Sequence, residues 1–326
     1  MEVLLLLPQK GLDYELIDSG NFERLERFGA YILARPEPKA MWNKSMSDKE
    51  WQSITHTRYQ TGTGFGKAGK EESGTWKMLK KMPEQWNITY QGTGFHLTMR
   101  LGLTAFKHIG IFPEQAPNWD FIYEATSRLV SLHHPINHLP FSTLSTLSTL
   151  QTYEPSNRQT VKLLNLFAYT GGASITARAA GADVTHLDAV RQVVTWAREN
   201  MEISGLDGIR WMVEDAIKFV QRQVRRGALY QGIILDPPAY GHGPQGERWK
   251  LDECLFELLQ ECNSILAPQN SFVLLNLYSN GYSAVLANTL ALSAFGTSGS
   301  SSFGELMVED SFGKRLPLSV FARIKR

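Results

Sequence analysis

The sequence predicts an α/β protein in which a mostly parallel sheet follows a smaller, β-rich N-terminal unit. Up to Leu103, short apolar and aromatic runs are separated by turn signals such as TGTG at 61–64, which is typical of a small β-rich unit. From Val161 onward, apolar runs of strand length alternate with longer amphipathic stretches. This alternation is typical of a parallel α/β sheet.

The strands and helices follow from these runs. We expect N-terminal strands at 3–7, 28–34, 86–90 and 95–100, a loop at 65–73, and a helix at 119–132. The parallel sheet should use 162–167, 183–187, 209–213, 232–235 and 271–277, and a final hairpin should pair 304–308 with 318–324. The repeat STLSTLSTL at 142–150 is short low-complexity sequence, typical of a linker or a tolerated insertion, and we assign it no function.

Length and composition set the broad class. A chain of 326 residues exceeds what one compact core usually fills, so we expect domains at 1–104 and 105–326. The net charge of +1 gives no argument for a polyanionic partner, so a nucleic-acid surface would have to be a local patch. Ordinary solvated charge is the alternative for each candidate patch. The candidates are Lys67, Lys70, Lys77, Lys80 and Lys81, and a second group of Arg222, Arg225 and Arg226.

Several classes of protein are disfavoured. The apolar run at 3–7 is too short for a signal peptide or a membrane span. Cys254 and Cys262 are too far apart for a CxxC knuckle and fit a reducing compartment, so we expect a cytoplasmic protein. His133 and His134 are adjacent and have no carboxylate or cysteine at ligand spacing, so we expect no metal.

Two adjacent glycines follow the first strand of the parallel sheet. In the run 165–174 (NLFAYTGGAS), Gly171 and Gly172 let the backbone turn sharply and approach a ligand at the start of a helix, whose amides favour a polar or anionic group. A strand-to-helix turn with small residues for packing would show the same pair. The glycines alone therefore leave a cofactor loop and a plain turn open.

Acidic residues end the next two strands. Asp188 lies roughly 20 residues beyond the glycines, a position that suits hydrogen bonds to two ribose hydroxyls. An NAD enzyme would show the same acid, but the GxGxxG pattern is absent, so the dinucleotide interpretation is the minor alternative. Asp215 could accept a hydrogen bond from an adenine amine, and capping of the following helix would explain it equally well.

The fourth strand ends in Asp236, Pro237, Pro238, Ala239 and Tyr240. The two prolines are stiff and cannot donate hydrogen bonds, so they hold an open loop beside the carboxylate. A carboxylate followed by rigid carbonyls can accept hydrogen bonds from an amine and so direct its lone pair at an electrophilic methyl group. A plain strand exit is the alternative.

In this order, the glycine turn, the two acids and DPPAY resemble the class I S-adenosylmethionine-dependent methyltransferases, which have a Rossmann-like sheet. The similarity is to the branch containing the ribosomal RNA large-subunit cytosine-C5 and guanine-N7 methyltransferases, which share NLFAYTGG and a DPP motif. It covers 106–324 well, and the stretches 106–122, 236–251 and 274–283 look like one subgroup of that branch. The N-terminal part matches only the subgroup, at 35–42.

The resemblance implies S-adenosylmethionine as cofactor. It places 110–119 over the cofactor, with Glu114 and Asn118 in the pocket, although a rigid interdomain crossover would explain that segment as well. The implied cofactor-binding residues are Phe112, Gln115, Asn165, Phe167, Thr170, Gly171, Gly172, Asp188, Ala189, Glu214, Asp215 and Ala216. The implied catalytic residues are Asp236, Pro237, Pro238 and Tyr240.

One departure bears on the reaction. Cytosine-C5 methylation needs a cysteine thiolate, and neither 236–241 nor 275–283 contains cysteine. A nitrogen nucleophile needs only positioning, so we expect methylation of an RNA base nitrogen, with ribosomal RNA as the expected substrate, Asp236 as acceptor and Tyr240 as a stacking face. The lysines at 67–81, with Trp76 and Trp86, would hold the RNA. A protein or small-molecule acceptor, or a non-catalytic binding protein with a vestigial pocket, are the alternatives.

Overall fold

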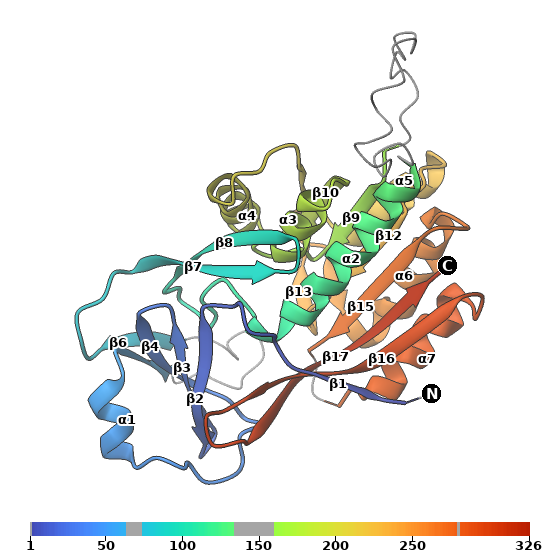
Figure 1. Ribbon diagram of the computed structural model, residues 1–326. Helices are drawn as coiled ribbons and strands as arrows, with labels where there is room; N and C mark the ends of the chain where they lie inside the picture. The colour runs from blue at the N-terminus through green and yellow to red at the C-terminus, as the bar shows by residue number, and fades with distance from the viewer. Residues whose placement is uncertain (1, 63–73, 134–159, 279–280) are drawn as a thin grey trace, which may run out of the picture.

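The computed structural model describes residues 2–62, 74–133, 160–278 and 281–326. The N-terminal and C-terminal parts each build a sheet of their own, and the C-terminal sheet carries helices on both faces (Figure 1). The expected loop at 65–73 and the STL repeat at 142–150 lie outside the described residues, as do Lys67, Lys70 and His134.

The large sheet has the strand order β1-β16-β17-β15-β12-β9-β10-β11 within the described ranges. Neighbours from β15 to β11 run parallel, whereas β17 lies antiparallel between β15 and β16. The predicted parallel-rich α/β sheet and its closing hairpin are therefore confirmed. Its strands are β1 (Leu4–Leu6), β9 (Lys162–Leu166), β10 (Asp183–Asp188), β11 (Arg210–Val213), β12 (Gly232–Leu235), β15 (Phe272–Leu277), β16 (Ser300–Glu309) and β17 (Arg315–Lys325).

Side chains that alternate along the strands divide the core into two layers. Leu163 on β9 and Ile234 on β12 pack with α2 and α3, whereas Leu164 and Ile233 pack with α5, α6 and α7 on the other face. Both faces are covered, which explains why these strands are continuous apolar runs. The helices are α2 (Ala116–His133), α3 (Gly172–Ala179), α4 (Arg191–Ile203), α5 (Ala216–Arg225), α6 (Leu251–Ile265) and α7 (Ala284–Phe295).

The N-terminal sheet corrects one predicted strand. We expected a single strand at 28–34, but the chain reverses at Gly29, whose φ of +61° belongs to the left-handed region, so that Phe28 pairs with Tyr31 across a tight turn. The sheet order is β2-β3-β4-β5-β6. Its elements are β2 (Tyr14–Gly20), β3 (Glu23–Phe28), β4 (Tyr31–Pro36), α1 (Asp48–Ile54), β5 (Thr57–Thr61) and β6 (Gly74–Met78), and a separate hairpin joins β7 (Gln85–Gly92) to β8 (Phe95–Gly102).

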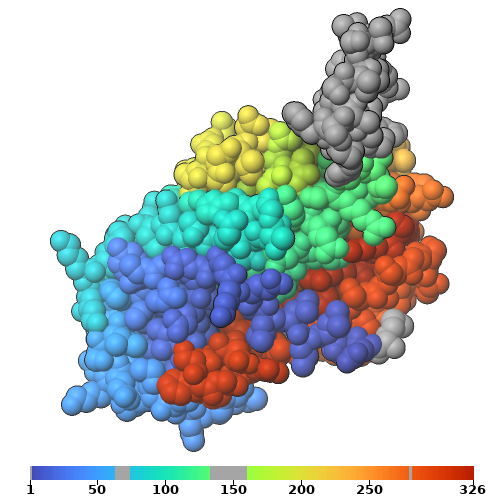
Figure 2. All heavy atoms as spheres, viewed as in Figure 1, coloured from blue at the N-terminus to red at the C-terminus, as the bar shows by residue number. Residues whose placement is uncertain are grey.

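Several contacts cross the division proposed at residue 104. β1 joins the large sheet by parallel pairing with β16, and Trp196 of α4 donates to the Arg100 carbonyl of β8. The turn between β16 and β17 reaches the N-terminal sheet, where Lys314 Nζ lies 2.8 Å from the buried Asp18 carboxylate. Figure 2 shows the red atoms of that turn packed among blue N-terminal atoms. The N-terminal unit is thus tied to the large sheet at separate points.

Within the described ranges, no helix is both long and apolar enough to cross a bilayer.

Candidate active site

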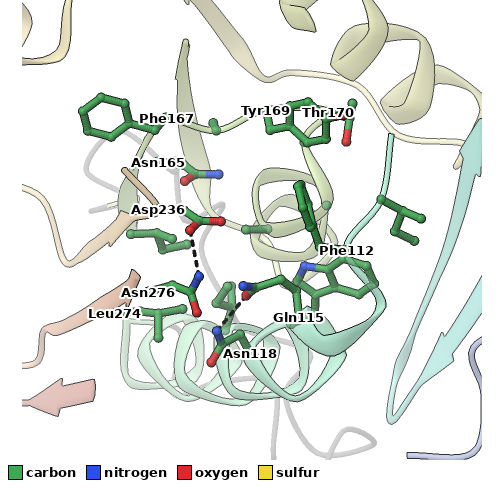
Figure 3. Close-up of a pocket in the computed structure, with 18 of the residues that line it drawn as sticks. Phe112, Gln115, Asn118, Asn165, Phe167, Tyr169, Thr170, Asp236, Leu274 and Asn276 are labelled. Atoms are coloured by element: carbon green, nitrogen blue, oxygen red, sulfur yellow. Dashed lines mark hydrogen bonds between the residues drawn. The ribbon is translucent and has the colours of Figure 1, made fainter. Parts of the chain in front are cut away.

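A pocket of about 560 Å3, including space open to solvent, lies at the carboxyl ends of β9, β12 and β15, beside the start of α2 (Figure 3). Ligands of open parallel sheets bind at this edge. Nine of the residues proposed from the sequence line it: Phe112, Gln115, Asn118, Asn165, Phe167, Thr170, Gly171, Gly172 and Asp236. The structure thus brings the 110–119 segment, the glycine turn and the DPP motif to one cavity.

The loop after β9 has an unusual backbone. Phe167 and Tyr169 have φ values of 56° and 47°, which side-chain-bearing residues seldom adopt and which concentrate at ligand sites. Gly171 has a φ of 92°, and a Cβ atom on Gly172 would lie 2.8 Å from the Trp119 indole. Both glycines are therefore required, one for its dihedral angle and the other for the close approach of α2.

Asp188 holds this loop from the end of β10. Its Oδ2 accepts a hydrogen bond of 3.0 Å from the Tyr169 amide, and its Oδ1 accepts one of 3.0 Å from the Val190 amide. Burial raises the pKa of Asp188 above its ordinary value. The carboxylate lies outside the pocket wall itself, but Tyr169 belongs to that wall. A carboxylate can accept about four hydrogen bonds, so Asp188 keeps acceptor capacity for a ligand hydroxyl.

The residues after β11 have partners within the protein. Asp215 caps α5, accepting a 3.0 Å hydrogen bond from the Lys218 amide, so the capping role that the sequence left open is present. Glu214 accepts a 2.6 Å hydrogen bond from Arg222. Neither residue, nor the adjacent Ala216, nor Ala189 after Asp188, lines the pocket. In the described part of the chain, Asp215 Oδ2 accepts no hydrogen bond.

Asp236 is the carboxylate inside the pocket. Its Oδ1 accepts a 2.8 Å hydrogen bond from Asn276 Nδ2, drawn as a dashed line in Figure 3. Burial raises the pKa of Asp236 to about 7; the Asn276 hydrogen bond opposes this rise and the nearby Glu114 adds to it. The group therefore changes its charge near neutral pH.

The two prolines differ in their environment. The Pro238 carbonyl accepts a 2.7 Å hydrogen bond from the Trp249 indole, whereas none of the residues that the structure describes donates to the Pro237 carbonyl. Pro237 is buried beside the pocket. This leaves the Asp236 carboxylate and the Pro237 carbonyl as adjacent acceptors.

Tyr240 lies outside the pocket wall. It begins β13 (Tyr240–His242), which pairs with β14 (Arg248–Lys250), and its side chain is 48% exposed. Its Oη lies 3.1 Å from His242 Nε2. The predicted stacking role of Tyr240 therefore concerns a surface beside the pocket.

The segment over the pocket is joined to the end of β15. Tyr278 Oη donates to Glu114 Oε1 at 2.9 Å and accepts from Gln115 Nε2 at 3.1 Å. Asn118 Nδ2 donates to Gln115 Oε1 at 2.7 Å. Burial raises the pKa of Glu114. These bonds fix the wall formed by Phe112 and Gln115.

Sequence reasoning missed Asn276 as a functional residue. Asn276 lies in the stretch 274–283, which carries the family resemblance. Its role depends on β15 lying beside β12, which brings its amide to Asp236. Ser319 of β17 donates to Asn276 Oδ1 at 3.1 Å and so fixes the orientation of that amide. A polar residue within the apolar strand 272–277 was the available signal.

Two further expectations concern other parts of the molecule. Trp86 was expected to offer a stacking surface, but it is only 9% exposed and packs edge-on against Tyr31, so that expectation is wrong.

Cys254 and Cys262 lie on α6, as expected, and neither lines the pocket. Burial raises the pKa of Cys262, which keeps it a thiol. In the described ranges, no group of three His, Cys, Asp or Glu side chains could hold a metal ion.

Comparison with known proteins identifies the fold. The family model described as S-adenosylmethionine-dependent methyltransferase matches residues 150–276. The crystal structure of the SAM-dependent methyltransferase from Agrobacterium tumefaciens is similar over 99% of this chain and 93% of that chain, with 32% identity and a TM-score of 0.81. The chain belongs to the S-adenosylmethionine-dependent methyltransferase family. The cofactor of this methyltransferase family is S-adenosylmethionine (SAM), as the sequence predicted.

Curated relatives of the methyltransferase match shorter regions. The ribosomal RNA large subunit methyltransferase K/L of Shewanella frigidimarina is 30% identical over 118 residues, which cover 35% of this chain and 16% of that protein. The ribosomal RNA large subunit methyltransferase I of Klebsiella pneumoniae is 33% identical over 82 residues, 24% of this chain and 20% of that protein. This methyltransferase thus matches a fifth or less of the length of these relatives.

The residues present fit SAM. Gly171 and Gly172 line the pocket at the first turn of α3, and Asn165 Oδ1 has no hydrogen-bond donor among the residues that the structure describes. Asp188 adds a carboxylate at the end of the neighbouring strand. Backbone amides, a neutral acceptor and a carboxylate match the polar groups of a methionine and a ribose.

Proposed function

We propose that this methyltransferase transfers a methyl group from SAM to a nitrogen atom of an RNA base, and that ribosomal RNA supplies the base. The observation that carries the proposal is Asp236: a carboxylate in the pocket wall, oriented by Asn276, with no cysteine among the pocket residues that the structure describes. Such a site can position a nitrogen nucleophile, whereas it lacks the thiolate that a carbon nucleophile of a pyrimidine requires.

The proposed cofactor contacts follow the strand order. Asn165, Thr170 and the glycine turn would hold the methionine part, Asp188 the ribose, and Asp215 Oδ2 the adenine amine. β10 and β11 are adjacent and in register at Asp188 and Val213, so the two acids project from neighbouring strand ends. SAM supplies an electrophilic methyl group on a sulfonium. The Glu214 side chain is held by Arg222 and would not contact the cofactor directly.

Asp236 and the Pro237 carbonyl would orient the acceptor nitrogen. An ionised carboxylate can accept a hydrogen bond from an N–H group, aligning the nitrogen lone pair with the methyl group, and can then take up the proton that the product loses. The pKa of Asp236 at about 7 suits both roles near neutral pH. The aromatic rings of Phe112 and Tyr169, with centroids 5.5 Å apart, stand on the pocket wall where a planar base could stack.

Surface lysines support RNA as the substrate, in addition to the relatives. Lys77, Lys80 and Lys81 are exposed on and after β6. Trp76 of the same strand donates to the Thr104 carbonyl, and the chain from Thr104 leads directly to Phe112 at the pocket. An RNA phosphate backbone held by these lysines would lead toward the pocket. The two curated relatives described above are both named as ribosomal RNA large subunit methyltransferases.

The test is transfer of radiolabelled methyl groups from SAM to total RNA, total protein and small metabolites from cells that lack the gene, followed by mass spectrometry of the labelled nucleosides. We expect label in ribosomal RNA, released as an N-methylated nucleoside. Label at carbon 5 of cytosine would contradict the nitrogen assignment, and label in protein or metabolites would replace the RNA assignment.

A further inference from the structure

A buried chain of hydrogen bonds runs away from the pocket through Asn165. Asn165 Nδ2 donates to Ser174 Oγ at 2.9 Å, and Ser174 Oγ lies 2.9 Å from His186 Nδ1. The three side chains are 2%, 0% and 0% exposed. Asn165 and His186 are partners on the adjacent strands β9 and β10, and Ser174 reaches them from α3. Of the three, only Asn165 lines the pocket.

The donors and acceptors of this chain limit where its hydrogens lie. The Asn165 amide nitrogen can only donate, so Ser174 Oγ accepts there. The Ser174 hydroxyl hydrogen can then be donated to its other polar neighbour, His186 Nδ1, which is unprotonated in that case. The ring hydrogen then lies on Nε2, which has no hydrogen-bond partner among the described residues, and Asn165 presents its carbonyl oxygen to the pocket.

A hydrogen on His186 Nδ1 would give two alternatives. Ser174 Oγ could accept from both His186 and Asn165, which would leave the serine hydrogen without an acceptor among these three side chains. Ser174 could instead accept from His186 and donate to Asn165, which would have to turn its carbonyl inward. The Asn165 NH2 group would then face the pocket.

The surroundings of His186 keep the ring neutral. Burial lowers the pKa of His186 to about 3, so the ring carries a single N–H at physiological pH. A hydrogen bond with the Tyr169 backbone opposes this fall in the pKa. The Trp211 ring covers the imidazole edge-on at 4.8 Å between centroids.

We propose that Ser174 and His186 are positioning residues that hold the Asn165 carbonyl oxygen toward the pocket, where it accepts a hydrogen bond from the ammonium group of the cofactor's methionine. The opposite orientation would set an NH2 donor against that ammonium group. This inference rests on the proposed cofactor contacts, and it assigns a role to two residues that never touch the cofactor.

The binding test separates orientation from general damage. Isothermal titration calorimetry compares S-adenosylhomocysteine with 5′-methylthioadenosine, which has the same adenosine but lacks the ammonium and carboxylate groups. Ser174→Ala should weaken S-adenosylhomocysteine binding at least about tenfold, the cost of a charge-assisted hydrogen bond, and leave methylthioadenosine binding unchanged. Ser174→Thr, which keeps the hydroxyl, should restore much of the affinity. His186→Phe should behave as Ser174→Ala does.

Two results would overturn the inference. Equal losses for both ligands in Ser174→Ala would mean that the residue only supports the loop, and normal affinity for both would mean that the chain does not set the amide. If the wild type binds S-adenosylhomocysteine and Ser174→Ala is normal, the inference fails while the proposed cofactor stands.

A second measurement does not depend on any variant. Long-range 1H–15N correlation spectra of the 15N-labelled wild-type protein distinguish the two neutral imidazole tautomers. We expect His186 to show a protonated Nε2 and an unprotonated Nδ1. A protonated Nδ1 would contradict the proposal directly, whatever the protein binds.

Discussion

Asn276 on β15 donates a 2.8 Å hydrogen bond to Asp236 at the end of β12, and this bond opposes the rise in the pKa of the carboxyl that burial causes. With burial raising it and this bond lowering it, the pKa of Asp236 is about 7. The charge of the proposed acceptor therefore depends on a neighbour from a strand far along the chain.

The rate of methyl transfer should depend on pH through Asp236. Because only the ionised carboxylate can take up the proton of the nucleophile, kcat/KM should rise with pH and level off above an apparent pKa near 7. Asp236→Asn should lower kcat/KM by about 100-fold, the lower range for a positioned acid or base, and remove this limb. A limb that persists in Asp236→Asn would assign the titration to another group.

Removing Asn276 should shift the rising part of the same pH profile of kcat/KM. Asn276→Leu deletes the hydrogen bond that lowers the pKa of Asp236, so the limb should shift to higher pH. Asn263→Ala, which deletes the acceptor of an Arg326 hydrogen bond away from the pocket, is the matched control and should keep the wild-type profile. An unchanged profile in Asn276→Leu would contradict the link between the two residues.

The free energy of unfolding should show the opposite dependence on pH. The pKa of Asp236 is raised in the folded state, so its contribution to stability is present below the unfolded-state pKa and is lost as pH rises toward 7. Asp236→Asn cannot ionise and should be more stable than the wild type at pH 8, by on the order of 2 kcal/mol, with little difference at pH 4. Urea unfolding at the two pH values measures this. Equal stability at pH 8 would mean that the carboxyl is not desolvated.

The sequence was sufficient for the strand and helix pattern of the large sheet. Buried strands such as 232–235 are unbroken apolar runs because both faces are covered, and the glycine turn and DPP motif mark their carboxyl ends. Pairings between distant segments were not readable. Asn276 with Asp236, and Ser174 with His186, are neighbours only because of strand order and the packing of α3.

Local backbone chemistry explains the remaining differences. The run from Phe28 to Ala34 is apolar enough for one strand, but Gly29 adopts a positive φ and splits it into two antiparallel strands. Trp86 follows a polar stretch and resembles a surface residue, yet the alternation of β7 turns it inward. β1 pairs with β16 from the far end of the chain, a contact that no local pattern encodes.

Methyl transfer should not require cysteine. Cys254→Ser and Cys262→Ala both lie on α6, away from the pocket, and each should keep near-wild-type kcat. Cys262→Ala should lower stability by roughly 1 kcal/mol because that thiol is fully buried. Activity assays on folded variants measure this. Loss of activity in Cys254→Ser would restore a covalent mechanism.

RNA binding should depend on the lysines near β6. Lys77→Glu and Lys81→Glu should each weaken binding, and the slope of log affinity against log salt should fall by about 0.7 for each phosphate of single-stranded RNA that a lysine no longer neutralises. Lys10→Glu, also exposed but outside this group, is the control. Filter binding at several salt concentrations gives the slopes. Equal effects of all three changes would indicate a general charge effect and not a patch.

Binding of SAM in the pocket, with Asp188 at the ribose, underlies every role proposed above. Isothermal titration calorimetry of SAM with the wild type and Asp188→Ala measures it, with Asp207→Ala, an exposed acid on the loop after α4, as control. We predict micromolar binding by the wild type and Asp207→Ala, and a loss of at least about tenfold in Asp188→Ala, since two hydrogen bonds to a charged group disappear. Undiminished binding by Asp188→Ala would remove that carboxylate from the ribose site, and no binding by the wild type would contradict the assignment of the pocket to SAM.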